Sequence, residues 1–460
     1  MRISFVEARS PGLHIFSKFR IPRLGAVLLA TILRDMGHET RVFIEDTTEP
    51  DWSYIENSDL LCVSTITSTA PRAYELALKA KEAGIPVVMG GAHPSFMPEE
   101  ALIYSDYVVR QEGDESLPEL VRHLETGRPA LSDIGGISYK IGREVRNNPA
   151  REFLNRLDEL PMPDFSLVHG WKPTDIYPVS TSRGCPFECR FCSVISMFGR
   201  RYRFRSVEAT LKDLRSLSGT KTCIFFVDDN FAANKTRIKE VLKSVIAEKM
   251  KLKWSAQVRT DVASDRGLLR LMADSGCTTT YIGFESINPR TLEAYNKKQD
   301  LEEIKTCIRE VKAHDIEIHG MFVLGADTDD VDTIKRTADF AARAGIDTVQ
   351  FMMLTPLPGT PVFKELLSAG RLLHKNWLQY DAHHAVFRPA LMGPDTLHIE
   401  TLKAMGRFYS WGYILKHLHR LDLFHAAVGL YGRNAVRKAL KEAGSYLAEV
   451  LQNQPAPAQV

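Results

Sequence analysis

Three cysteines stand within eight residues of one another, at Cys185, Cys189 and Cys192. Thiolates at this spacing on one loop can hold three corners of a cubane iron–sulfur cluster. The fourth iron then has no protein ligand, so a small molecule can chelate it. A structural zinc site usually takes four ligands, and no fourth Cys or His lies close by in the sequence. The spacing therefore predicts a 4Fe-4S cluster with one open iron.

The composition is that of an ordinary globular protein. The 460 residues carry a formal net charge of +2, 44% of them are apolar, and seven are cysteines. A near-neutral charge argues against nucleic acid as the main ligand, because phosphate binders usually carry a basic excess. An odd cysteine count in so long a chain argues against a disulfide framework. No stretch approaches the roughly 18–20 apolar residues of a transmembrane segment, and Glu7 stands where a signal peptide would be apolar. We expect a cytoplasmic protein.

The first 125 residues alternate between expected strands and helices. Strands are expected at residues 2–6, 40–45, 60–65, 86–89 and 107–109, and helices at 24–36, 70–83 and 115–124. Strict alternation with short connections predicts a parallel, doubly wound sheet of Rossmann-like type. Ligands of such sheets bind in the loops that follow the strands, which singles out residues 64–70 and 90–96.

The alternation restarts on a larger scale after a Pro-rich segment. We expect four parts: residues 1–130 as the first domain, 131–177 as a linker with a small hairpin, 178–365 as a second domain and 366–460 as a helical C-terminal domain. Strands of the second domain are expected at residues 178–181, 223–228, 253–258, 280–284, 317–324 and 348–353. Six strand–helix units predict a partial (β/α)6 barrel with its chemistry on the loops after the strands. The tail at 453–457 is expected to fray.

The cysteine loop, placed after the first strand of a six-unit domain, resembles that of the radical S-adenosylmethionine superfamily. In that family the methionyl amine and carboxylate chelate the open iron. An electron from the cluster then cleaves the C–S bond and gives a 5′-deoxyadenosyl radical. The resemblance implies S-adenosylmethionine as a cofactor and an electron donor such as flavodoxin or ferredoxin as a partner. It also places Phe191, just before the last cysteine, near the adenine.

The later strand ends agree with this resemblance. Asp228, Asp229 and Asn230 end the second strand, where the family binds the methionine amino group; the same residues could instead form an Asx turn that caps the next helix. The other implied contacts are Gln257 and Arg259 after the third strand, Glu285 and Ser286 after the fourth, and Gly320 and Gly325 in the fifth. Glu285 or Ser286 would meet the ribose hydroxyls or the carboxylate. The glycines would let the backbone approach the adenine closely.

The first domain resembles the cobalamin-binding domain that precedes many of these radical enzymes, on the evidence of residues 22–25, 88–94 and 107–115. The resemblance implies cobalamin in the two singled-out loops, with contacts from Thr65, Ser68, Gly90 and Gly91. The D-x-H-x-x-G motif, whose histidine ligates cobalt in many cobalamin proteins, is absent from residues 1–150. Cobalamin would bind without that ligand, and His93 is not expected to replace it. The alternative is a Rossmann-like domain that serves only as a scaffold.

Together these features predict a radical enzyme that modifies an unactivated carbon of a small-molecule or lipid substrate, most of all by cobalamin-dependent methyl transfer. Oxidation, cyclisation or C–C coupling on a lipid, isoprenoid or tetrapyrrole-like substrate stays open. An iron–sulfur electron carrier or sensor is a hypothesis of another class, but a carrier needs no adenosine pocket. The sequence assigns no catalytic residue beyond the cofactor contacts.

Three weaker features stay open. Aromatic and basic residues alternate between Phe408 and Arg437, which predicts either a helix packed on its own domain or a peripheral, interfacial membrane contact. The histidines at 374, 383, 384 and 398 favour packing over a metal site. The basic run at 200–205 either steers an anionic ligand or solvates the next helix.

Overall fold

The computed structural model describes residues 1–10, 21–172, 176–220 and 222–452, so the tail at 453–457 that is predicted to fray lies outside the described residues. The chain divides into two compact units. The N-terminal unit comprises Met1–Gly12, Phe19–Pro186 and Ser193–Trp254, and the C-terminal unit comprises Leu13–Lys18, Phe187–Cys192 and Ser255–Val460.

The N-terminal unit contains a seven-stranded sheet in the order β2-β1-β3-β4-β5-β6-β7. Its strands are β1 (Arg2–Glu7), β2 (Glu39–Ile44), β3 (Leu60–Ser64), β4 (Val87–Gly90), β5 (Tyr107–Val109), β6 (Ile137–Ile141) and β7 (Glu144–Asn147). Strands β1 to β5 pair in parallel, and β6 and β7 add an antiparallel hairpin at one edge. The predicted parallel sheet is confirmed, and the hairpin predicted within 131–177 extends it.

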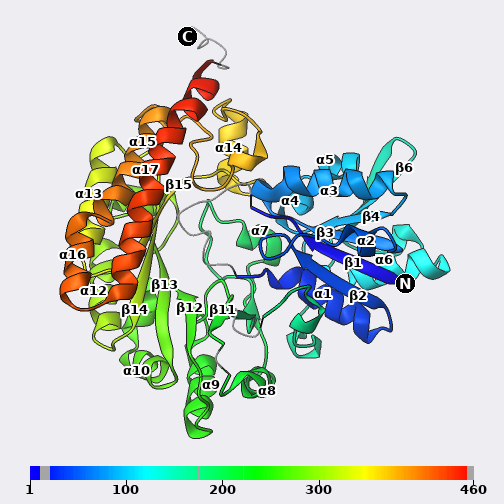
Figure 1. The fold of residues 1–460 in the computed structure, drawn as a ribbon, viewed down its shortest axis with the longest axis horizontal. Helices are drawn as coiled ribbons and strands as arrows, with labels where there is room; N and C mark the ends of the chain where they lie inside the picture. Colours follow the sequence, from blue (N-terminus) through cyan, green and yellow to red (C-terminus); the bar gives the residue numbers. More distant parts are fainter. Residues whose placement is uncertain (11–20, 173–175, 221, 453–460) are drawn as a thin grey trace. The chain divides into compact units, whose positions relative to one another are not determined.

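Helices cover both faces of this sheet, because its strands are apolar on both faces (Figure 1). The helices are α1 (Leu24–Asp35), α2 (Trp52–Ile55), α3 (Ala70–Glu82), α4 (Ala92–Phe96), α5 (Pro98–Tyr104) and α6 (Ser116–Thr126). Ile3 and Phe5 of β1 pack with α1 and α6, whereas Val6 packs with α3 and α5. A sheet that is buried on both faces is typical of the doubly wound fold.

The strands after residue 176 follow the order β15-β14-β13-β12-β11-β8. In the N-terminal unit the elements are β8 (Tyr177–Val179), β9 (Ser182–Arg183), α7 (Val194–Phe198), β10 (Arg203–Phe204), α8 (Val207–Leu217), β11 (Ile224–Phe226) and α9 (Lys235–Ala247). The strand β12 (Trp254–Val258) begins at the last residue of that unit. The remaining elements are α10 (Arg266–Asp274), β13 (Cys277–Glu285), α11 (Pro289–Ala294), α12 (Leu301–Lys312), β14 (Glu317–Leu324), α13 (Val331–Arg343), β15 (Thr348–Met353) and α14 (Pro361–Ser368). Six strands stand in sequence order with helices between them, and the pairs β8–β11, β13–β14 and β14–β15 are parallel, which confirms the predicted partial (β/α)6 barrel.

Side-chain caps fix where the barrel helices begin. Asp300 accepts a hydrogen bond from the Glu303 backbone N–H, and the Glu303 carboxylate accepts one from the Asp300 N–H, which completes a capping box at the start of α12. The side chains of Ser206, Asn234, Asp265 and Asp330 each accept one backbone N–H at the start of α8, α9, α10 and α13. The helices α9, α10 and α13 start within nine residues of the strand before them, whereas the connection from β8 to α8 is long and contains the cysteine loop.

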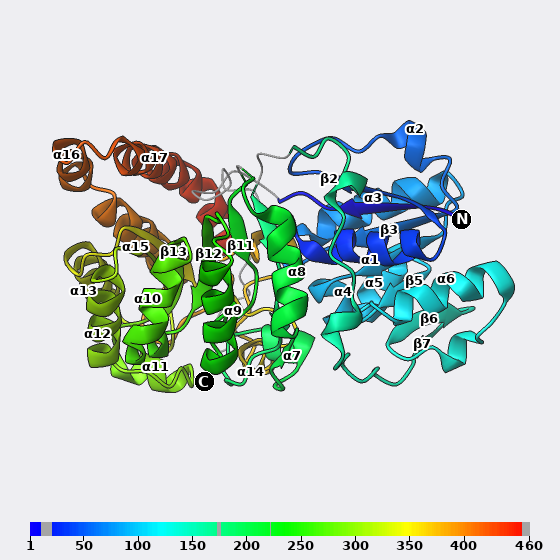
Figure 2. The ribbon, with the colours of Figure 1, turned by 90° about the horizontal axis from the view of Figure 1, so that it is seen from below.

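The chain ends in helices, as predicted. These are α15 (Pro394–Phe408), α16 (Trp411–His419) and α17 (Leu423–Gln452). Within the C-terminal unit α15 packs against α13 and α17, and α16 packs against α17 (Figure 2). In the described part of the chain, no helix is both long and apolar enough to cross a bilayer.

Candidate cofactor-binding site

Part of the cysteine loop, residues 187–192, packs within the C-terminal unit against the end of β12. The Arg259 guanidinium lies 3.6 Å from the centre of the Phe187 ring and donates a hydrogen bond to Cys189 Sγ at 3.8 Å. It also donates to the backbone carbonyl of Lys297. A cation beside a sulfur stabilises the thiolate, which is the form that ligates a metal. Arg259, predicted as a cofactor contact, is thus placed beside a cluster cysteine.

Residues that follow α11 hold the same loop from another side. The Arg190 backbone N–H donates to the Tyr295 carbonyl at 3.1 Å, and Asn296 Nδ2 donates to the Glu188 carbonyl at 3.0 Å. The Phe191 ring meets the Tyr295 ring edge-on, with 4.9 Å between the ring centres. Tyr295 and Asn296 carry no motif in the sequence, so only the structure reveals their role in positioning the loop.

Glu285 stands in the left-handed region of backbone space, with φ of +62°. Its Oε1 lies 2.7 Å from Lys297 Nζ, and both side chains are buried. Gly283 makes this pair possible, since a Cβ there would lie 2.4 Å from Glu285 Oε1. Lys297 is a partner that the sequence analysis missed, because nothing in the sequence marks a contact over twelve residues.

The other predicted cofactor contacts in the C-terminal unit differ in burial and in the residues packed against them. Ser286 is buried, and its Oγ accepts a hydrogen bond from the Asn288 backbone N–H at 3.0 Å. Gln257 is partly exposed on β12. A Cβ on Gly320 would lie 3.2 Å from Ile346, and one on Gly325, whose φ is +100°, would lie 2.7 Å from Leu397. Close packing of apolar neighbours therefore favours glycine at both positions.

Cys185 belongs to the N-terminal unit, where Gly184 shapes the turn before it. Gly184 has φ of +81°, and a Cβ there would lie 2.7 Å from the Arg201 carbonyl oxygen and 2.9 Å from that of Gly199. A residue other than glycine would be strained in this conformation and would also collide with backbone. All seven cysteines lie in the described chain and none forms a disulfide.

Asp228 is fully buried at the end of β11 and ties this strand to the segment before the cysteines. Its carboxylate accepts hydrogen bonds from the Thr181 backbone N–H at 3.1 Å and from the hydroxyls of Thr181 and Ser182. Burial raises the pKa of Asp228. This side chain is engaged within the protein, so its position serves the shape of the loop.

The next two residues, Asp229 and Asn230, make fewer side-chain hydrogen bonds within the protein than Asp228 does. Burial, together with the neighbouring Asp228 carboxyl, raises the pKa of Asp229 to about 7. The Asn230 side chain is buried, and neither its amide nitrogen nor its oxygen has a hydrogen-bond partner within the described residues. Burying an amide without partners is costly, so this position suits a polar ligand group.

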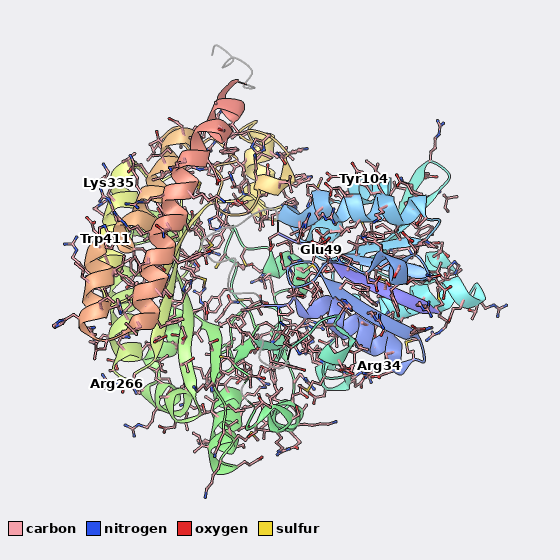
Figure 3. All side chains as sticks on the ribbon, in the orientation of Figure 1. Arg34, Glu49, Tyr104, Arg266, Lys335 and Trp411 are labelled. Atoms are coloured by element: carbon pink, nitrogen blue, oxygen red, sulfur yellow. The ribbon has the colours of Figure 1, made fainter. Side chains whose placement is uncertain are left out.

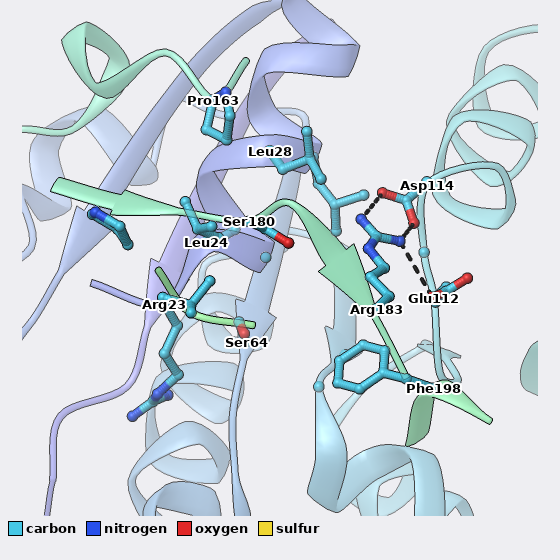
Figure 4. Close-up of a pocket in the computed structure, with 18 of the residues that line it drawn as sticks. Arg23, Leu24, Leu28, Ser64, Glu112, Asp114, Pro163, Ser180, Arg183 and Phe198 are labelled. Carbon is cyan, nitrogen blue, oxygen red and sulfur yellow. Dashed lines mark hydrogen bonds and ion pairs between the residues drawn. The ribbon is translucent and has the colours of Figure 1, made fainter. Parts of the chain in front are cut away.

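A cavity of about 520 Å³ lies within the N-terminal unit (Figure 4). The loops after β3, β4 and β5 line one side of it, and Ser180, Arg183 and Asp229 from the start of the barrel line another. Thr65, Gly90 and Gly91 line it as well, whereas Ser68 is buried outside its lining. A Cβ on Gly91 would lie 2.3 Å from the Thr65 carbonyl, so glycine lets the two predicted cobalamin loops meet.

Two arginines pair with acids of the loop after β5 beside this cavity. The Arg183 guanidinium contacts the two Asp114 oxygens at 2.6 and 3.0 Å and Glu112 at 3.4 Å (Figure 4). Arg203 contacts the two Glu112 oxygens at 2.8 and 2.7 Å. Burial lowers the pKa of Arg183, but the two carboxylates outweigh it and raise the pKa overall. The basic run at 200–205 is therefore partly buried in ion pairs, since Arg205 also pairs with Asp213.

The histidines singled out in the sequence, at 93, 374, 383, 384 and 398, do not line the cavity. His93 is buried beside the Tyr74 hydroxyl, 3.1 Å from its Nε2, and is not among the residues that line the cavity. His398 packs among other rings, and burial lowers its pKa to about 4, so its ring is neutral. His384 lies 3.0 Å from both Asp381 oxygens. This histidine group has the packing role that the sequence favours.

The residues present fit the three cofactors expected from the sequence. Cys189 has a cationic neighbour suited to a thiolate ligand. Asn230 offers a buried donor and acceptor that protein groups leave unused in the described chain. The cavity has the size of ordinary cofactor sites and joins the loops of a parallel sheet to a barrel strand end.

The raised pKa of Asp229 predicts a pH dependence of S-adenosylmethionine binding. If the ionised carboxylate accepts from the methionine ammonium group, the Kd should fall as pH rises through 7, by about tenfold between pH 6 and pH 8. Calorimetric titration of the anaerobic cluster-loaded protein measures this. Asp229→Asn should bind more weakly and show a flat profile, whereas Asp274→Asn on the exposed end of α10 should keep the slope. A slope retained by Asp229→Asn would contradict the assignment.

Two family descriptions match the chain. The model of the radical SAM superfamily matches residues 179–341, and that of the B12 binding domain matches residues 15–121. The first match spans the cysteine loop and the ends of β11 to β14. The second covers strands β2 to β5, and the loops after β3, β4 and β5 line the cavity.

Named relatives cover most of the chain. An uncharacterized methyltransferase of Pyrococcus horikoshii is 34% identical over 385 residues, 78% of this chain and 81% of that protein. The bacteriochlorophyllide d C-12(1)-methyltransferase of Chlorobaculum tepidum is 28% identical over 81% of this chain and 79% of that protein. The anaerobic magnesium-protoporphyrin IX monomethyl ester cyclase of Cereibacter sphaeroides is 27% identical over 89% of this chain and 70% of that protein.

A solved structure shares the fold. The radical S-adenosylmethionine methyltransferase TsrM from Kitasatospora setae, solved with cobalamin and a [4Fe-4S] cluster, superposes with a TM-score of 0.71 at 16% identity. The match covers 96% of this chain and 99% of that one.

Proposed function

We propose that this chain, which belongs to the radical S-adenosylmethionine superfamily and carries a B12 binding domain, methylates an unactivated carbon of a large apolar substrate. It is an enzyme whose cofactors are a 4Fe-4S cluster, S-adenosylmethionine and cobalamin. The observation that carries the proposal is the cavity of about 520 Å³, because the B12-domain loops and Asp229 of the barrel line the same space. A methyl donor held there would lie beside the S-adenosylmethionine site.

The chain's own residues have distinct roles in this proposal. Cys185, Cys189 and Cys192 hold the cluster, and Arg259 donates a hydrogen bond to the Cys189 sulfur. Asp229 and Asn230 bind the methionine amino group through the polar atoms that protein partners leave open. When bound, the cluster and S-adenosylmethionine supply the radical, and cobalamin supplies the methyl group.

The loops that line the cavity position the corrin. Gly90 and Gly91 allow close backbone approach there, and Thr65 lies against Gly91. No histidine lines the cavity among the described residues, so the groups that would hold cobalamin there are those of the loops after β3, β4 and β5. The remaining sequence-predicted contacts stay proposals, namely Phe191, Asp228, Gln257, Arg259, Glu285, Ser286, Gly320, Gly325 and Ser68.

The relatives suggest the chemical class of the substrate. Two of them are named for tetrapyrrole substrates, one as a methyltransferase and one as a cyclase. We therefore propose an apolar ring system of tetrapyrrole, isoprenoid or lipid type. Ring closure is the second candidate, because the cyclase aligns with 89% of this chain.

The decisive experiment follows a labelled methyl group. Anaerobic holoprotein is given a reductant, CD3-labelled S-adenosylmethionine and the apolar extract of cells that lack the gene. Methyl transfer predicts 5′-deoxyadenosine and a CD3-labelled product, and formation of the labelled product should depend on cobalamin. An unlabelled product would support ring closure instead, and product from cobalamin-free protein would overturn methyl transfer. If no 5′-deoxyadenosine forms, the chain does not perform radical chemistry.

A further inference from the structure

The turn between α16 and α17 carries a concentration of exposed apolar side chains. Leu421 is 85% exposed, Leu423 is 68% exposed and Phe424 is 60% exposed. Together with Trp411, Leu415, Leu418 and Leu430 they form what we call the apolar tip. These seven residues lie within 411–430, yet they are almost half of the sixteen large apolar side chains exposed in the described chain. A concentration of this kind marks an interaction surface.

The opposite face of α16 is used for packing, so the exposure of the apolar tip is not a sign of a loose helix. Ile414 is buried, and the Tyr413 hydroxyl donates to the Asp347 carbonyl at 2.7 Å. α17 approaches so closely that a Cβ on Gly429 would lie 2.9 Å from Ile414. Trp411, Leu415 and Leu418 recur at the spacing of one helical stripe. Trp411 is 52% exposed, and the Arg433 guanidinium of α17 lies 5.1 Å from its ring centre; Figure 3 marks its position.

Polar contacts hold the turn in this shape. Asp422 Oδ2 lies 2.8 Å from His417 Nδ1 and 2.8 Å from His425 Nδ1, and Asp422 Oδ1 accepts from the His425 backbone N–H at 3.1 Å. Within the described residues, these three side chains are the one group of His, Cys, Asp or Glu whose ligand atoms lie close enough together to share a single metal ion. Their mutual hydrogen bonds satisfy them without one. The consequence is a fixed presentation of Leu421, which has φ of +57°.

Basic residues surround the apolar tip. Residues 411–441 contain six Lys and Arg, at 416, 420, 433, 437, 438 and 441, and one acid, Asp422. Beside α16 lies a hollow of about 830 Å³, which we call the basic hollow. Seven Lys or Arg side chains from α12, α13 and α16 with its C-cap line it, against one acid, Asp347, which pairs with Lys312 at 2.7 Å. Four others, Lys305, Arg309, Arg336 and Arg343, contact acids outside the lining. Lys416 and Arg420 of this lining are the two with no ion pair among the described residues.

We propose that the apolar tip and the basic hollow bind the surface of a membrane that contains anionic phospholipid. The Leu, Trp and Phe side chains enter the boundary between headgroups and acyl chains, and Lys416 and Arg420 contact headgroup phosphates. The surface complements such a membrane in charge as well as in polarity. It anchors the protein peripherally and crosses nothing.

The proposed membrane-binding surface and the cofactor site lie at opposite ends of the barrel strands. Lys312 and Asp347 stand just before β14 and β15, at the amino-terminal ends of these strands, whereas Tyr295, which holds the cysteine loop, follows the carboxyl end of β13. The eight residues of β14 span about 26 Å. Membrane binding therefore leaves the cofactor end of the barrel free and does not depend on the proposed reaction.

Vesicle flotation of the full-length anaerobic holoprotein tests the proposal. We expect at least tenfold more protein bound to phosphatidylcholine vesicles that contain phosphatidylglycerol than to phosphatidylcholine alone. High salt should remove most of this gain. Lys416→Gln with Arg420→Gln should lose only the anionic gain, at roughly fivefold per residue. Leu421→Asp with Phe424→Asp should lose binding to both kinds of vesicle.

Matched controls make the result interpretable. Leu391→Asp changes another exposed leucine of the same unit, 58% exposed, and should float like the unchanged protein. All variants should cleave S-adenosylmethionine in solution at the unchanged rate, which reports an intact fold. Equal binding to both vesicle types would overturn the proposal. A second outcome would also overturn it. If light scattering shows a dimer that Leu421→Asp dissociates, and flotation of this variant is unchanged, the apolar tip joins two copies of the chain.

Discussion

Cys189→Ala should abolish both the iron–sulfur cluster and S-adenosylmethionine cleavage. Three thiolates hold the cluster in this proposal, and Cys189 is the one whose sulfur receives the Arg259 hydrogen bond. Two remaining ligands cannot retain a cubane that already has one open iron. We expect the iron content of anaerobically reconstituted protein to fall from about four per chain towards zero, and 5′-deoxyadenosine formation to fall to background.

Cys223→Ala is the matched control for this experiment. Cys223 lies just before β11, outside the cysteine loop, and is partly buried like Cys185 and Cys192. Burial raises the pKa of its thiol. The control protein should keep its iron, its absorption spectrum and its cleavage rate. Retention of either the cluster or the cleavage by Cys189→Ala would refute the ligand assignment.

The second large effect is expected at Arg183. Arg183→Leu leaves Asp114 and Glu112 with one cation fewer in a place where the Arg183 and Asp114 side chains are 15% and 7% exposed. Breaking a buried pair on one side costs about 3–5 kcal/mol, because the remaining charge stays uncompensated. We expect a markedly lower urea midpoint for the N-terminal unit, measured by circular dichroism. We also expect weaker cobalamin binding, measured by titration with the cofactor.

Two further variants separate this charge effect from a general loss of arginine. Arg215 pairs with Glu208 and Glu248 on the surface of the same unit, and Arg215→Leu should cost less than about 1 kcal/mol. Adding Asp114→Asn to Arg183→Leu should recover part of the stability, since it removes the stranded charge. If Arg183→Leu and Arg215→Leu lower the urea midpoint equally, the buried ion pair contributes no more to stability than the surface pair.

The sequence predicts most of the fold because the hydrophobic periodicity and the turn residues that end each element are local features of the chain. Apolar runs of strand length alternate with amphipathic segments, and turns such as Gly37 and Gly84 end the helices close to where the structure ends them. The cysteine loop is equally local, as three ligands and Gly184 lie within nine residues. Such features need no knowledge of which distant side chains come together.

The contacts that position the site could not be predicted in the same way. Lys297, Tyr295 and Asn296 act through partners in other elements, and no pattern in the sequence joins them to Glu285 or to the loop. Gly320 and Gly325 show the converse problem. A glycine pattern that indicates approach to a ligand also arises from close packing against Ile346 and Leu397.

The pairing of Arg183 and Arg203 with Glu112 and Asp114 bears on how the protein can be divided and recombined. The acids belong to the matched B12 domain and the arginines to the matched radical domain. Each ion pair therefore joins residues of two different family domains. A fragment that stops at residue 130 would leave two acids stranded. A transplantable module would have to continue to about Arg205, and exchange of the first domain between relatives would work only when both sets of charges travel together.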